Sequence, residues 1–116
     1  MTGEHRLLSV NKTVAIADVT IPAGGAQTLD NHGIVFVGDR AGVVLQKEAG
    51  NQVTVSFDTQ REWTTESYDS ANLPKVGEKV YLGASDGKLT KTASGNKLVG
   101  YYWGTIGGAA LFSLHA

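Results

Sequence analysis

The chain has 116 residues, with 15 glycines, 2 prolines, no cysteine and a formal net charge of −1. This length fits one domain of about 100–150 residues and is too short for two. The absence of cysteine excludes disulfides, thiolate zinc sites and cysteine nucleophiles. The ten basic residues are scattered, whereas nucleic-acid binding needs a local excess of Lys and Arg, so we expect no nucleic-acid partner.

Hydropathy argues against a membrane protein. Strictly apolar runs reach only four residues or so, as at 34–37, far short of the roughly 20 that a membrane helix needs. The first residues carry mixed charge and lack the apolar region of a secretory signal. We therefore expect a soluble protein that is not exported.

The N-terminal residues 1–12 form a polar segment whose apolar side chains are Leu7, Leu8 and Val10, besides the initial methionine. So few apolar residues cannot hold a terminus in a fixed position by themselves. We expect residues 1–12 to be a flexible arm that precedes a single β domain at 13–116.

The remaining chain has the pattern of short strands separated by turns. Residues 53–58 show the clearest alternation, with Val53, Val55 and Phe57 on one face and polar side chains on the other. Within 14–21 the alternation changes phase, which predicts a bulge or break near Ala17 and Asp18. Further strands are expected at 33–37, 43–46, 79–82, 88–92, 98–105 and 109–114.

Glycine-containing turns join these strands. Asp86-Gly87 supplies the positive-φ positions of a tight hairpin between residues 82 and 89. Gly50-Asn51, residues 94–96 and Gly107-Gly108 have the composition of further reversals. About eight short strands joined in this way predict an all-β fold, either a small β-barrel or a sandwich.

Residues 59–74 interrupt this pattern of short strands and turns. At 16 residues the segment is longer than the usual connection of about 2–6 residues, and long loops in compact domains are generally functional or mobile. Its apolar residues are Trp63, Tyr68 and Leu73, in mostly polar surroundings. The sequence leaves two alternatives: a helical turn, or an extended excursion that folds back through Trp63.

No motif indicates catalysis, a cofactor or a metal. Residues 33–38 have the glycine spacing of a phosphate-binding loop, but Asp39-Arg40 follows where Lys-Ser or Lys-Thr is required. The histidines are not at the spacing of metal ligands. The carboxylates of the 59–74 loop are best explained as a solvated acidic surface. These residues are His5, His32 and His115, and Glu62, Glu66 and Asp69.

The last two expected strands carry apolar side chains on both faces. Tyr101 and Trp103 share one face of a strand, and Tyr102 points to the other. One face can join the core, while the other needs cover from the 59–74 loop or from a second subunit, because large exposed aromatic patches are rare on monomers. We expect an oligomer interface that includes Tyr101, Trp103, Leu111 and Phe112.

Five blocks of the sequence, in this order, resemble the phage capsid cement (decoration) proteins of the DUF2190 family. They lie at residues 35–44, 50–55, 76–82, 87–93 and 95–100. Two segments depart from the family pattern. Residues 59–74 replace a shorter link, and Tyr101-Tyr102-Trp103 replaces a more aliphatic segment.

This resemblance implies a small β-barrel that decorates the outer surface of a phage head, after synthesis in the bacterial cytoplasm. The implied partner is the major capsid protein, the common state is a homotrimer, and no catalysis or cofactor is involved. We expect Leu7, Leu8 and Val10 to order on contact with the capsid. The alternative is a virion-surface glycan- or receptor-binding module in which aromatic side chains stack on sugars, with Trp63, Tyr68, Tyr101 or Trp103 as candidates.

Overall fold

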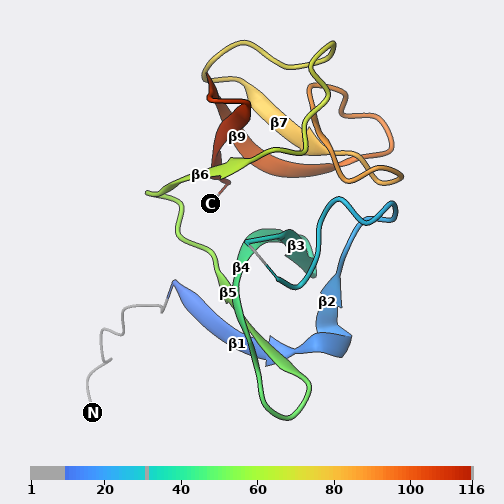
Figure 1. The fold of residues 1–116 in the computed structure, drawn as a ribbon, viewed down its shortest axis with the longest axis vertical. Coiled ribbons are helices and arrows are strands. Elements are labelled where there is room, and N and C mark those ends of the chain that lie inside the picture. Colours follow the sequence, from blue (N-terminus) through green and yellow to red (C-terminus); the bar gives the residue numbers. More distant parts are fainter. Residues whose placement is uncertain (1–9, 31, 116) are drawn as a thin grey trace, which may run out of the picture.

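The computed structural model describes residues 10–30 and 32–115, in which ten strands form two antiparallel sheets of five strands each. Sheet A has the spatial order β1 (Asn11–Ala15), β5 (Gln52–Ser56), β4 (Arg40–Glu48), β3 (Ile34–Val37) and β2 (Val19–Thr20). Sheet B has the order β6 (Glu62–Thr65), β10 (Ala109–Leu114), β9 (Lys97–Ile106), β7 (Lys79–Leu82) and β8 (Leu89–Thr90). Each sheet is built from one continuous half of the chain, and the sheets follow one another along the long axis (Figure 1). The all-β prediction is confirmed.

The predicted strand at 14–21 is broken where its alternation changes phase. A short 3₁₀ helix, η1 (Ile16–Asp18), separates β1 from β2. Val14 and Val19, which are out of step in the sequence, pack against the same hydrophobic cluster as a result. This break accounts for one of the two strands beyond the eight expected, and it places Asn11 and Lys12 in β1 rather than in the predicted arm.

The 59–74 segment supplies the other additional strand, β6, so the extended alternative is confirmed and the helical turn is wrong. Beyond β6 the chain runs beside β8: Leu89 N–H donates to the Ser67 carbonyl at 3.0 Å, and Asp69 N–H donates to the Leu89 carbonyl at 2.9 Å. These hydrogen bonds connect the β6 edge of sheet B to its β8 edge, as in a small barrel. The three apolar residues of the segment all pack on the main core, namely Trp63, Tyr68 and Leu73.

Strand β3 and the first half of β4 are buried on both faces and join the two halves. Ile34 and Phe36 belong to the main core, together with residues of sheet B. Val35 and Val44 face the other way, into a second cluster with Val53 and the rest of sheet A. Residues 34–37 are all apolar because a strand that is covered on both sides needs no polar face.

Gln27 links the segment between β2 and β3 to strand β3 and to the β7–β8 connection. Its side chain is 4% exposed, its Oε1 accepts a hydrogen bond from Ile34 N–H at 2.9 Å, and its Nε2 donates to the Gly87 carbonyl at 2.8 Å. Both ends of this buried amide are therefore satisfied, as buried polar groups require.

Candidate interaction surface

Strand β10 separates core residues from surface residues by simple alternation. Its buried residues are Ala110, Phe112 and Leu114, while Leu111 and Ser113 are half-buried on the outer side. Phe112 is only 1% exposed and lies opposite Trp63 across the β6–β10 pair. Of the four residues expected at an oligomer interface, Phe112 therefore belongs to the core of the chain itself.

Strand β9 has a β-bulge at Trp103, which lies on the exposed face of the strand. Phe112 pairs with Tyr102 and Leu111 pairs with Gly104, so Trp103 is the extra residue between two paired positions. Its side chain is 42% exposed, and its Nε1 donates to the Oγ of Ser113 at 2.8 Å on the outer face. Tyr102 lies on the opposite face, as the sequence predicts, and the structure shows that this face is the buried one.

Tyr101, Trp103 and Leu111 thus share the outer face of sheet B, as the sequence predicts. The Tyr101 ring lies 5.9 Å from the ring of His115, centroid to centroid. Two large apolar side chains, Val76 and Ile106, are each 64% exposed. Val76 is held close to this face because the next residue, Gly77, donates its N–H to the Tyr102 carbonyl at 2.7 Å.

The face of sheet A that carries Ile34 and Val43 is polar by contrast, where β1 and β5 extend beyond the main core. The hydroxyls of Thr13 and Thr54 are hydrogen-bonded at 2.9 Å across β1 and β5. Glu48 Oε2 accepts hydrogen bonds from Thr54 Oγ1 at 2.7 Å and from Gln46 Nε2 at 2.8 Å. These hydrogen bonds lower the pKa of the Glu48 carboxyl, the one from Thr54 most and that from Gln46 next. Hydration suits this face, whereas the outer face of sheet B exposes aromatic surface to water.

The hydrogen bonds of Glu48 predict a measurable pH effect. Because the carboxyl pKa is lowered in the folded chain, its contribution to stability is present above the unfolded pKa and is lost as the pH falls through the folded pKa. We expect Thr54→Val to raise the Glu48 pKa toward its ordinary value, as followed by NMR titration of the side-chain carboxyl. An unchanged Glu48 titration in that variant would contradict the hydrogen-bond assignment, and Thr13→Val serves as the matched control.

Of the three residues expected to bind a capsid, the structure describes Val10, which precedes β1. Leu7 and Leu8 are outside the described residues. Val10 is 49% exposed, and its carbonyl accepts a hydrogen bond from Phe57 N–H at 2.6 Å. This hydrogen bond holds Val10 beside the end of β5.

A family model described as phage cement protein matches residues 10–113, which include both sheets. The chain belongs to the phage cement protein family. No curated protein and no solved structure matches the chain. Membership implies a capsid-decorating role at the virion surface, and the family is a structural and generally non-catalytic one.

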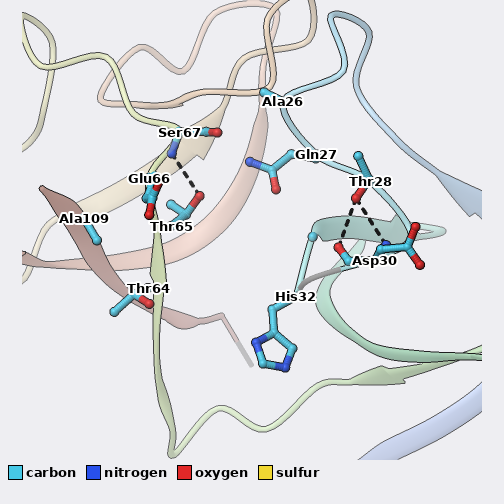
Figure 2. A pocket seen from close by; sticks show the side chains of 11 residues that line it. Ala26, Gln27, Thr28, Asp30, His32, Thr64, Thr65, Glu66, Ser67 and Ala109 are labelled. Carbon is cyan, nitrogen blue, oxygen red and sulfur yellow. Dashed lines mark hydrogen bonds between the residues drawn. The ribbon is translucent and has the colours of Figure 1, made fainter.

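This cement protein has a polar cleft of about 570 Å³ between the segment before β3 and strands β6 and β10 (Figure 2). The hydrogen bonds drawn there are local, from Thr28 to Asp30 and from Ser67 to Thr65. His32 has a φ of 60° and meets the Trp63 ring edge-on at 5.9 Å. In residues 10–30 and 32–115, no group of three or more His, Asp or Glu could hold a metal ion. No helix of the described chain is long and apolar enough to cross a membrane.

The structure also limits which aromatic residues of the cement protein are accessible to a ligand. Trp63 is 6% exposed, the guanidinium of Arg61 lies 4.5 Å from its ring centroid, and His32 contacts its edge. Tyr68 is half-buried against the main core. Of the four residues considered for sugar stacking, Tyr101 and Trp103 remain at the surface.

Proposed function

We propose that this chain decorates the outer surface of an assembled phage head as a homotrimer and stabilises the lattice of the major capsid protein without catalysis. The observation that carries this proposal is the contrast between the exposed surfaces of the two sheets. Sheet A presents a polar, internally hydrogen-bonded surface, and sheet B presents Tyr101, Trp103 and Leu111. Exposed apolar surface of this kind is typical of protein–protein contacts.

In this proposal the two regions have separate tasks. The outer face of sheet B packs against neighbouring subunits, and the arm with Leu7, Leu8 and Val10 orders on the capsid. Three arms on one trimer raise the effective concentration of each contact, so weak individual contacts together give firm attachment. A shell that is bound by such trimers resists disassembly because ligand binding stabilises the bound state.

Electron microscopy of heads mixed with the purified protein tests this function. Undecorated heads that are incubated with excess protein should gain one density per equivalent lattice position, centred on local threefold axes. Decorated heads should then retain their contents at higher temperature than undecorated heads. Absence of added density, together with a saturable signal on a glycan array, would contradict the cement function and support the glycan-binding alternative.

A further inference from the structure

An exposed apolar side chain and an apolar groove lie at opposite ends of strand β9. We call this groove the socket. Ile106 is the last residue of this strand and is 64% exposed. It pairs with Ala109 across a two-residue turn made by Gly107 and Gly108, whose φ values are 57° and 82°. Two consecutive positive φ values form the tight turn that best suits a hairpin, so Ile106 is held at the tip of a well-defined β9–β10 hairpin.

The socket lies at the beginning of β9. It is a groove of about 190 Å³ between the chain that leaves β2, the start of the β7–β8 connection and the end of the β8–β9 connection. Its walls include Ile21, Pro22, Phe36, Leu82, Ala84 and Lys97. A cavity of about 150 Å³ accommodates a molecule as large as benzene, so this groove has room for one branched aliphatic side chain.

Intrachain contact between Ile106 and this socket is excluded by the strand itself. Nine residue steps separate Lys97 from Ile106, and at about 3.3 Å per residue they span about 30 Å. Ile106 can therefore enter only the socket of another copy. A contact between two different surfaces of the same chain is heterologous, and it generates a closed ring when the rotation between copies allows closure.

Charges beside the two surfaces are complementary. Glu66 is exposed and lines the same cleft as Ala109, the residue opposite Ile106 (Figure 2). Lys97 is exposed at the rim of the socket, where its Nζ lies 5.2 Å from the centroid of the Phe36 ring. A carboxylate therefore lies near the hairpin that carries Ile106, and an ammonium group lies beside the socket.

We infer that Ile106 of each copy inserts into the socket between Pro22 and Lys97 of its neighbour, and that three such contacts close the trimer. The inference rests on the self-association in the proposed function and specifies its contact. It assigns association to the ends of β9 in addition to the outer face of sheet B. Residue 106 did not stand out in the sequence and becomes significant through its position on the hairpin.

Cysteine cross-linking tests this contact directly, because the chain has no cysteine of its own. In the variant Ile106→Cys with Ala84→Cys, mild oxidation should produce disulfide-linked trimers on non-reducing electrophoresis. Each single variant can link only like positions, so it should remain monomeric under the same conditions. Dimers from Ile106→Cys alone, or no trimer from the double variant, would overturn the head-to-tail contact.

Charge reversal provides a second, independent measurement. Glu66→Lys and Lys97→Glu should each raise the dissociation concentration at least fivefold in analytical ultracentrifugation, and the combined variant should recover most of this loss. Lys12→Glu on sheet A is the matched control and should have no effect. Additive losses in the combined variant, or a wild-type chain that is monomeric at 100 µM, would also overturn the inference.

The same variants separate this inference from the cement function. Ile106→Asp should abolish trimers in solution, whereas Ile106→Leu should retain them. Decoration of heads by wild-type protein is measured alongside. Normal decoration and trimers that persist in Ile106→Asp would contradict the contact alone, while trimers without decoration would contradict the function alone.

Discussion

We expect the substitution Phe112→Ala to lower the free energy of unfolding by about 3–5 kcal/mol, which is the usual cost of removing a buried aromatic ring. Phe112 is 1% exposed and packs in the main core beside Trp63. Small domains have total stabilities of about 5–15 kcal/mol, so this loss is a large part of the whole. Urea unfolding, monitored by tryptophan fluorescence at one fixed protein concentration, measures it.

Leu111→Ala is the matched control, because Leu111 is the preceding residue on the same strand and faces outward. We expect it to weaken self-association while it changes the stability of the dissociated chain much less. The protein concentration must be the same in both experiments, since association itself adds to apparent stability. Equal destabilisation by the two substitutions would contradict the division of β10 into a core face and an interface face.

Deleting residues 1–10 is expected to abolish decoration of heads and to leave the domain folded. The first strand of the structure begins at Asn11, so the deletion removes no strand residue. It does remove the two leucines that we expect to be buried on the capsid. Burial of a leucine side chain contributes about 1.5–3 kcal/mol, so two of them account for roughly a hundredfold or more in affinity per arm.

Deletion of residues 1–6 is the control for this experiment, since it shortens the arm but retains Leu7, Leu8 and Val10. Circular dichroism and ultracentrifugation should show the same fold and the same association state for both truncated proteins. Head occupancy, counted in electron micrographs, should fall only for the longer deletion. Normal occupancy after deletion of residues 1–10 would show that capsid contact lies elsewhere on the molecule.

Much of the strand pattern could be predicted from the sequence alone, because alternation and turn chemistry are local. The strands at 79–82 and 109–114 have the predicted bounds, and the phase change near Ala17 becomes η1. The positions of Tyr101 and Tyr102 on opposite faces of β9 follow from the same rule of alternation. The five blocks of family resemblance are likewise properties of the sequence, and the family match agrees with them.

Strand β6 was harder to predict, because its residues Glu62–Thr65 form a strand largely through pairing with β10, some 50 positions away in the chain. Only Trp63 in that segment carries a strong apolar signal. The burial of Phe112 against Trp63 depends on this pairing, so the assignment of Phe112 to the core also required the tertiary structure. The local pattern of β10 placed apolar residues on both faces and could not say which face would be covered.

The sequence by itself determined an all-β chain of short strands and tight turns, without thiol chemistry, and its membership of the phage cement family. Only the tertiary structure decided that β3 and the first half of β4 would be buried on both faces, and which face of β9 and β10 would be covered. It also brought Ile21, Phe36 and Lys97 together around one groove, with Ile106 at the far end of the same strand. The physical reason is range: alternation and turns depend on neighbouring residues, whereas faces, bulges and sockets depend on which distant strands pair.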